Sequence, residues 1–209
     1  LGCGGVLVLP PYFYKDCTAE GLFRYYAELI EEVADHRLRL YLYHIPQMTG
    51  VPITADLIDR LVSEFHDEIA GLKDSSGNMA NTLVLIEAFP DLAFFPASET
   101  FLLQGLKQGV AGCISATANV QAGAIRALID GADREDAQKL HERVAAVRAA
   151  VLKSPTIPAL KALIAHYRND PQWLMVRPPL LALDPSEQMR LVQDLRQDLN
   201  FTLEFSSGA

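Results

Sequence analysis

The sequence predicts an α/β fold of the TIM (β/α)8 barrel type, represented by about five β/α repeats and followed by a C-terminal helical appendix. Short apolar segments alternate with helical segments over residues 1–130, which is typical of a parallel sheet. The chain contains neither G-x-G-x-x-G nor G-x-x-x-x-G-K-[ST], the glycine-rich turns typical of open doubly wound sheets. Because these turns are absent, a barrel is favoured over an open sheet.

The predicted strands are short, apolar on both faces, and followed by proline, lysine or small polar residues. This pattern suits parallel strands that are covered on both sides. The five predicted strands are residues 5–9, 39–43, 69–73, 92–95 and 111–115.

The predicted helices follow these strands, and several carry recognisable end signals. Thr18 and Thr54 are suitable N-caps, Pro90 ends one helix, and Gly109 ends another. The predicted helices are residues 19–34, 54–65, 78–89, 100–108 and 119–130, and then 132–152, 157–167 and 186–199 with no strand between them.

The number of repeats also predicts how the chain is organised. A complete barrel has eight strands and typically ~250 residues, so the first three or so units, roughly 90 residues, are expected to be missing. The absence of an initiator methionine fits a piece of a longer protein. We expect a barrel portion at 1–130, C-terminal helices at 131–200, and a tail at 201–209 that ends in a disordered Ser-Ser-Gly-Ala segment.

Composition and charge exclude several classes of function. The net charge is -8, and no run of lysine and arginine is long enough to bind nucleic acid or an anionic membrane. No apolar run reaches membrane-spanning length. Cys3, Cys17 and Cys113 form no pattern, which favours a reducing cytoplasm over disulfides or a thiolate metal site. The five histidines have no ligand spacing, so neither a metal nor a cofactor is expected.

Lys73 is the candidate nucleophile, at the end of the apolar strand 69–73. Alternation places Ile69, Gly71 and Lys73 on one face of that strand, and Ala70 on the other. Burial disfavours an ammonium ion, and a neutral amine is what attack on a ketone requires. The strand pattern alone favours an ordinary strand-end lysine that reaches solvent over a nucleophile.

Tyr43 ends the preceding strand and is the candidate proton carrier. Adjacent strands of a barrel have neighbouring ends, so Tyr43 is expected within reach of Lys73. A lysine imine of a 2-oxo acid accepts the electrons of the broken C3–C4 bond, and a phenol beside it can move the proton of the substrate oxygen. We expect Gly71 to leave room for the adduct. Taken alone, Tyr43 fits an ordinary core tyrosine better than a proton carrier.

Three segments together resemble the pyruvate-dependent class I lyases, the dihydrodipicolinate synthase / N-acetylneuraminate lyase family. They are Tyr43-His-Ile-Pro-x-x-Thr-Gly50, Gly71-Leu-Lys-Asp-Ser-Ser-Gly-Asn78 and Gly112-Cys-Ile-Ser-Ala-Thr-Ala-Asn-Val120. The resemblance runs from Gly5 to about Leu199 and includes the helical appendix. It implies that Lys73 forms the Schiff base with pyruvate, that Tyr43 carries the proton, and that Ile114 presents its backbone carbonyl to the keto acid. It also implies a homo-oligomer, commonly a tetramer.

Three departures from the family pattern are present, and the two at Met48 and Phe13 argue against the synthase reaction. The family's Gly-Thr-Thr-Gly-Glu loop, which holds the pyruvate carboxylate, is absent. Met48 stands where the synthases carry an arginine for the second substrate's carboxylate, and methionine cannot make that charged contact. Phe13 stands where they carry a relay tyrosine from a neighbouring subunit. Tyr12 and Tyr14 flank Phe13 and can substitute for it.

The resemblance therefore favours an aldolase acting on a 2-oxo-3-deoxy sugar acid or a related 2-oxo acid, with a small aldehyde as partner product. Arg177-Pro-Pro179 resembles the sugar-acid aldolases, and Ser98 and Glu99 stand where sialate-lyase-like members contact substrate hydroxyls. Solvated loop residues are an equal alternative for these two. The remaining alternatives are the synthase reaction of pyruvate with aspartate semialdehyde, and an inactive fragment or binding module of the same fold. We expect the 209-residue chain alone to be inactive.

Overall fold

The computed structural model of the chain describes residues 2–203, and the Ser-Ser-Gly-Ala segment expected to be disordered lies outside that range. The described residues form two compact units that divide between Ile114 and Ser115. Between residues 2 and 203, no helix has both the length and the apolar character that a membrane span requires.

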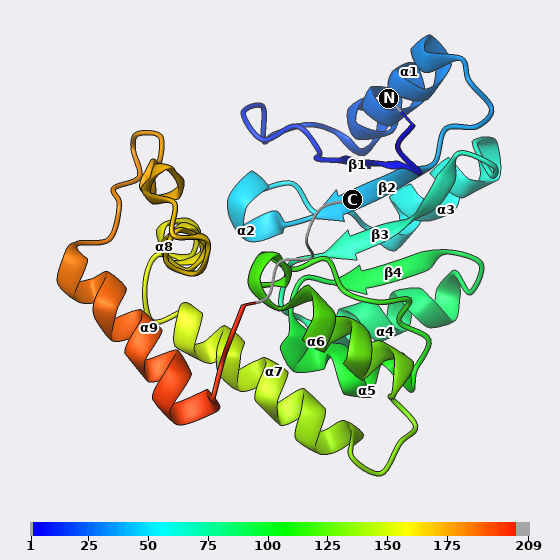
Figure 1. The fold of residues 1–209 in the computed structure, drawn as a ribbon. Helices are drawn as coiled ribbons and strands as arrows, with labels where there is room; N and C mark the ends of the chain where they lie inside the picture. The colour runs from blue at the N-terminus through cyan, green and yellow to red at the C-terminus, as the bar shows by residue number, and fades with distance from the viewer. Residues whose placement is uncertain (1, 204–209) are drawn as a thin grey trace. The chain divides into compact units, whose positions relative to one another are not determined.

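The first unit is built on a parallel sheet of four strands in sequence order (Figure 1). These are β1 (Val6–Val8), β2 (Leu40–His44), β3 (Ile69–Asp74) and β4 (Ala93–Pro96). Each strand is hydrogen-bonded to the next one along the chain, as expected for successive β/α repeats. The first four predicted strands are confirmed.

The fifth predicted strand, 111–115, is wrong, because the structure assigns no strand there. The segment does bond to β4, since Ala111 N–H donates to the Phe94 carbonyl at 3.0 Å and Ile114 N–H donates to the Pro96 carbonyl at 3.2 Å. A regular ladder advances by equal steps on both strands. Here the segment advances three residues while β4 advances two, so the register is lost between these two bonds.

Helices connect the strands of the first unit, and side-chain caps define where three of them begin. Thr18, Thr54 and Asn78 each accept a hydrogen bond from a backbone N–H in the first turn of the helix that follows. The helices are α1 (Ala19–Val33), α2 (Pro46–Thr49), α3 (Ala55–Glu64), α4 (Met79–Ala88), the 3-10 helix η1 (Glu99–Phe101) and α5 (Leu102–Leu106).

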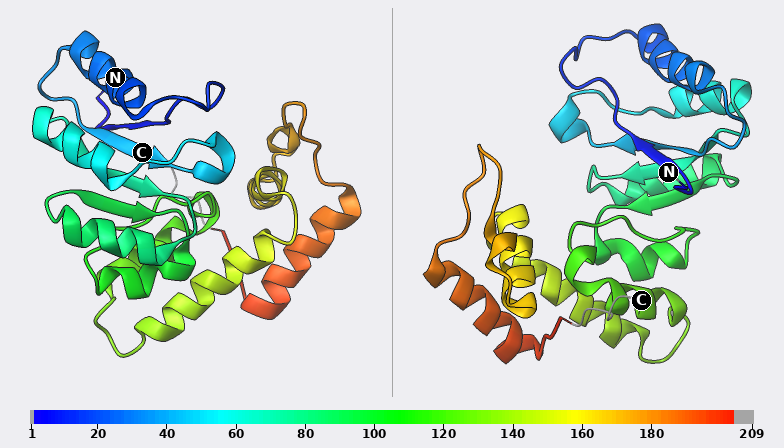
Figure 2. Two further views of the ribbon diagram at one scale, coloured as in Figure 1. Left: turned by 180° about the vertical axis from the view of Figure 1, so that it is seen from behind. Right: turned by 45° about the horizontal axis from the view of Figure 1, so that its top comes forward.

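The two faces of the sheet differ in what covers them. Helices α1, α3 and α4 lie along one face, where Leu40, Leu42, Leu72 and Phe94 are completely buried (Figure 2). The opposite face carries Tyr41, Tyr43, Lys73 and Phe95, which are only half-buried in this unit. The chemically active side chains therefore stand on the face that the helices do not cover.

A β-bulge in β3 changes the predicted alternation of side chains. Leu40 pairs with Ile69, but Tyr41 pairs with Gly71, so Ala70 is an extra residue without a partner. The bulge turns Ile69 into the helix-covered core together with Leu72. The prediction that Ile69 shares a face with Lys73 is wrong.

Gly71 is required by the close approach of β4. A Cβ atom added at Gly71 would lie 2.0 Å from the carbonyl oxygen of Ala93, and that oxygen belongs to backbone and cannot rotate away. Room for a bound adduct is therefore not needed to explain a glycine at this position.

Replacing Gly71 by alanine is expected to destabilise the first unit by about 3 kcal/mol or more, because β3 and β4 must separate. The measurement is urea denaturation followed by circular dichroism. Gly123→Ala is the matched control, since a Cβ there meets no atom within 4 Å. That helical site should be unchanged or slightly stabilised. Equal denaturation midpoints for G71A and the unsubstituted chain would contradict the packing argument.

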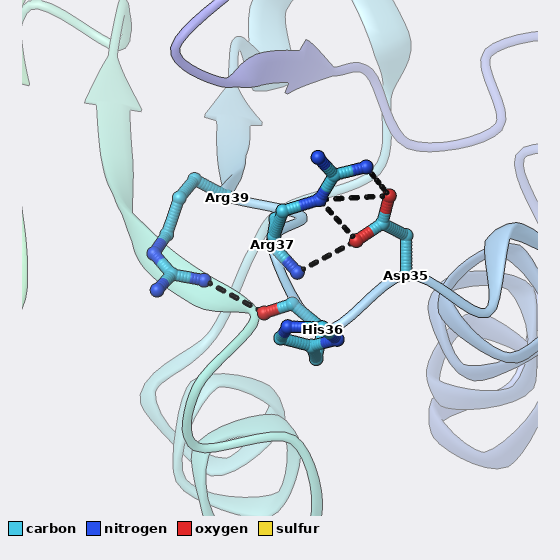
Figure 3. Close-up of polar contacts among 4 residues, drawn as sticks. All are labelled: Asp35, His36, Arg37 and Arg39. Carbon is cyan, nitrogen blue, oxygen red and sulfur yellow. Dashed lines mark hydrogen bonds and ion pairs between the residues drawn. The ribbon is translucent and has the colours of Figure 1, made fainter.

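The turn between α1 and β2 is held by charged side chains at the amino end of β2 (Figure 3). The Asp35 carboxylate accepts hydrogen bonds from the backbone N–H and the guanidinium of Arg37, and these bonds hold the pKa of Asp35 well below its usual range. The Arg39 guanidinium donates to the His36 carbonyl at 3.2 Å. These contacts explain the order of the turn and lie at the opposite end of β2 from Tyr43.

The second unit is helical in its described part. It contains α6 (Ala118–Asp130), α7 (Ala137–Val151), α8 (Thr156–Arg168), the 3-10 helix η2 (Pro171–Leu174) and α9 (Pro185–Leu199). Asp184 and Glu187 form a reciprocal capping box at the start of α9. The predicted division into a barrel portion at 1–130 and C-terminal helices at 131–200 stays a prediction. The two compact units divide before residue 130, between Ile114 and Ser115, because α6 packs on α7 and α8.

Candidate active site

Neighbouring strands bring Lys73 and Tyr43 together. The two residues are register partners on β3 and β2. The Lys73 ammonium nitrogen donates a hydrogen bond of 2.9 Å to the Tyr43 hydroxyl and lies 4.1 Å from the centre of the Tyr43 ring. The two side chains are within reach of each other, as their positions at the strand ends predict.

The surroundings of Tyr43 favour its ionised form. Partial burial alone raises the pKa of the Tyr43 phenol, but the hydrogen bond from Lys73, the nearby Ser75 hydroxyl and the positive charge of Lys73 lower it, and the net effect is a lowered pKa. A phenol that ionises more readily is better suited to accept a proton from a substrate hydroxyl.

Ser75 is a part of the site that the sequence did not identify. Its hydroxyl oxygen is buried, lies near the Tyr43 phenol, and makes no hydrogen bond of ordinary length to residues 2–203. Ser75 follows Lys73 by two positions, so continued alternation would have placed it on the same face. Its backbone N–H donates to the His44 carbonyl at 2.8 Å, and its own carbonyl accepts a 2.7 Å hydrogen bond from the Gln47 side chain.

Asp74 and His44 are register partners one residue beyond the reactive pair, on the helix-covered side. Both side chains are buried, at 3% and 6% exposure. Asp74 accepts hydrogen bonds of 2.8 Å from the Ser76 N–H and from the Thr82 hydroxyl of α4, so it holds the turn after β3. His44 points away from Tyr43, and its Nδ1 accepts a 3.0 Å hydrogen bond from the Ile53 N–H.

The other predicted site residues lie at the same end of the sheet but do not all face solvent. Met48 is 72% exposed on α2. The Ile114 N–H bonds to Pro96, and its carbonyl accepts no hydrogen bond from the described residues. Ser98 is half-buried and caps η1 through the Thr100 N–H. Glu99 is completely buried, so the alternative that it is a solvated loop residue is wrong.

Phe13 stands in a loop of exposed aromatic residues between β1 and α1. Tyr12, Phe13 and Tyr14 are 65%, 80% and 78% exposed, and the Phe13 and Tyr14 rings meet edge to face at 5.3 Å. The hydrogen bond and the cation–π contact of Lys73 are made with Tyr43 and not with this loop. Over residues 2–203, no three His, Cys, Asp or Glu side chains are grouped so that they could hold a metal ion.

Comparison with known proteins identifies the family. The model of the dihydrodipicolinate synthetase family matches residues 1–198, almost the entire chain. The chain belongs to this family. It is 36% identical, over 90% of its length, to an uncharacterized DapA-like lyase of Chloroflexus aurantiacus, and 32% identical, over 93% of its length, to a 4-hydroxy-tetrahydrodipicolinate synthase of Corynebacterium urealyticum. It spans 62% and 63% of the length of these two relatives.

Solved structures of family members have the same fold. The dihydrodipicolinate synthase of Agrobacterium tumefaciens is similar with a TM-score of 0.81 at 30% identity, covering 95% of this chain and 67% of that one. A Sulfolobus 2-keto-3-deoxygluconate aldolase has a TM-score of 0.81 at 23% identity, covering 93% and 64%. Both are TIM-barrel proteins, so the predicted fold class is confirmed.

Proposed function

We propose that this chain carries the reactive pair of a pyruvate-dependent aldolase that acts on a 2-oxo-3-deoxy sugar acid or a related 2-oxo acid. Lys73 is the Schiff-base nucleophile and Tyr43 is the proton carrier. The observation that supports this most is the 2.9 Å hydrogen bond between Lys73 Nζ and the Tyr43 hydroxyl at the ends of two adjacent parallel strands.

The geometry suits the chemistry of carbon-carbon cleavage. The neutral Lys73 amine adds to the 2-oxo carbon, and loss of water leaves an iminium ion. Tyr43 then takes the proton of the C4 hydroxyl, the C3–C4 bond breaks, and its electron pair enters the iminium as an enamine while the aldehyde departs. Protonation of the enamine and hydrolysis of the imine release pyruvate and restore Lys73.

Met48 favours the aldolase over the synthase. Its exposed thioether on α2 provides no cation for the carboxylate of aspartate semialdehyde. Similarity to 4-hydroxy-tetrahydrodipicolinate synthases supports the second candidate, the condensation of pyruvate with that aldehyde. The third candidate, an inactive fragment or binding module, is favoured by the part of the relatives' length that this chain does not span.

Three further residues are proposed as substrate contacts. The backbone carbonyl of Ile114 accepts no hydrogen bond from the described residues and is suited to face the bound keto acid. Ser98 presents a hydroxyl at the same end of the sheet. Direct contact by Glu99 requires that its carboxyl, now fully buried, become exposed when substrate binds. We further propose that the active protein is a cytoplasmic homotetramer, on the family resemblance and the unpatterned cysteines.

The test is a substrate panel assayed on this chain and on a longer form that restores eight β/α units. We expect the longer form to release pyruvate from 2-oxo-3-deoxy sugar acids, measured by coupling to lactate dehydrogenase. We expect the 209-residue chain to show no turnover. Condensation of pyruvate with aspartate semialdehyde, with no cleavage of any sugar acid, would establish the synthase instead. Turnover by the short chain would refute its predicted inactivity.

A further inference from the structure

The imidazole of His44 ties a loop to the end of the strand that carries Tyr43. His44 is 6% exposed, and its Nδ1 accepts the backbone N–H of Ile53 at 3.0 Å. Because Nδ1 is the acceptor, the neutral ring must carry its proton on Nε2. Ile53 is itself buried at 3% exposure, so its N–H has no water to replace this partner.

The loop that His44 holds is connected to the reactive pair through short, directional contacts. It leads from α2 to α3, and Thr49 closes its first turn by donating to the carbonyls of Ile45 and Val51, both at 3.1 Å. From the same small helix, Gln47 bonds to the Ser75 carbonyl at 2.7 Å. Ser75 follows Lys73 by two residues, so the Gln47–Ser75 hydrogen bond joins the segment that contains the α2–α3 loop to the turn after Lys73.

We propose that His44 is a positioning residue for the Tyr43–Lys73 pair: its neutral imidazole holds the α2–α3 loop on the end of β2, and protonation of Nδ1 releases that loop and weakens the site in acid. This inference rests on the proposed function of Lys73 and Tyr43. His44 touches neither substrate nor the reacting atoms and acts through the loop.

The charges around His44 set the direction of the pH effect. Burial lowers the pKa of His44, and the negative charge of Asp74 on β3 partly opposes this. Asp74 is the charged group of the described residues that acts on His44, and its carboxylate is already bound by the Ser76 N–H and the Thr82 hydroxyl. Because the folded pKa lies below the unfolded value of 6.5, the contribution of His44 to stability is complete above that pH. It is lost as pH falls through the folded pKa.

Two substitutions separate positioning from simple space-filling. His44→Asn retains an acceptor oxygen near the place of Nδ1 but cannot titrate in this range. His44→Phe retains a flat ring but offers no acceptor. His66→Asn is the control, since the His66 side chain is 76% exposed and its one contact within the described residues is a 3.4 Å approach to Asp67.

The first measurement is hydrogen exchange of the Ile53 amide in the 209-residue chain, corrected for intrinsic exchange. Protection in the unsubstituted chain and in H66N should fall as pH drops from about 7.5 to about 5. It should stay constant in H44N and be low throughout in H44F. The same acid loss of Ile53 protection in H44N as in the unsubstituted chain would overturn the proposal.

The second measurement is the rate of borohydride trapping of pyruvate on Lys73 in the longer form, at saturating pyruvate. The trapping rate of the unsubstituted protein, divided by that of H44N, should fall about tenfold as pH drops from about 7.5 to about 5. H44F should be trapped about tenfold more slowly than H44N at every pH. Equal trapping rates for H44F and the unsubstituted protein would overturn the role in positioning. If no protein is labelled, the proposed function fails, and the amide measurement still decides whether His44 holds the loop.

Discussion

Lys73→Ala is expected to abolish pyruvate-dependent borohydride labelling and to lower turnover by about 10³-fold or more, because no other amine takes its place in the imine. The measurement is intact mass followed by peptide mapping, with sodium borohydride added in the presence and absence of pyruvate. The control is Lys107→Ala, which removes an exposed lysine of the same unit. The K107A protein should still be labelled on Lys73.

The same variant tests the electrostatic coupling of the pair. Lys73 lowers the pKa of Tyr43 through a hydrogen bond and a positive charge, so Lys73→Ala should raise that pKa, as followed by NMR of ring-labelled tyrosine. Labelling that persists in K73A would show that the nucleophile lies elsewhere. The pKa of Tyr43 could also be the same in K73A as in the unsubstituted protein, while the unsubstituted protein is labelled normally. Lys73 would then remain the nucleophile but would not lower the pKa of the phenol.

Tyr43→Phe is expected to separate imine formation from cleavage. The Lys73 amine remains, so borohydride labelling with pyruvate should persist, whereas turnover of the cleaved substrate should fall by about 10²- to 10⁴-fold because no group takes the substrate proton. Single-turnover cleavage and pyruvate trapping, measured on one preparation, provide both quantities.

Tyr41→Phe is the matched control for this prediction. Tyr41 lies on the same face of β2, and its ring packs edge to face on Phe95 at 5.8 Å, a contact that phenylalanine preserves. We expect Y41F to retain most of the activity. A Tyr43→Phe enzyme that cleaves substrate at the unsubstituted rate would transfer the proton-carrying role to another group, and Ser75 would be the first to examine.

The site resists prediction where it depends on how deeply the folded chain buries a side chain. Glu99 follows a strand in a polar stretch of sequence, which favours a solvated loop, yet the folded chain buries it completely. The place of Ser75 beside the Tyr43 phenol depends on the backbone bond from the Ser75 N–H to the His44 carbonyl of the neighbouring strand.

The sequence alone was enough to predict four parallel strands, the helices with threonine caps, and the positions of Lys73 and Tyr43 at adjacent strand ends. These features depend on local periodicity, on turn and cap residues, and on the regular pairing of successive β/α units. Its family motifs also determined membership of the dihydrodipicolinate synthetase family, which the match over residues 1–198 shows.

Only the tertiary structure decided the bulge at Ala70, the loss of regular pairing after Ala111, and the bond between His44 and Ile53. Each depends on how closely two backbone segments approach after folding. The carbonyl of Ala93 leaves no space for a Cβ at Gly71, and a buried N–H of Ile53 must find an acceptor. Periodicity along one segment contains no information about the distance to another, and that distance sets these contacts.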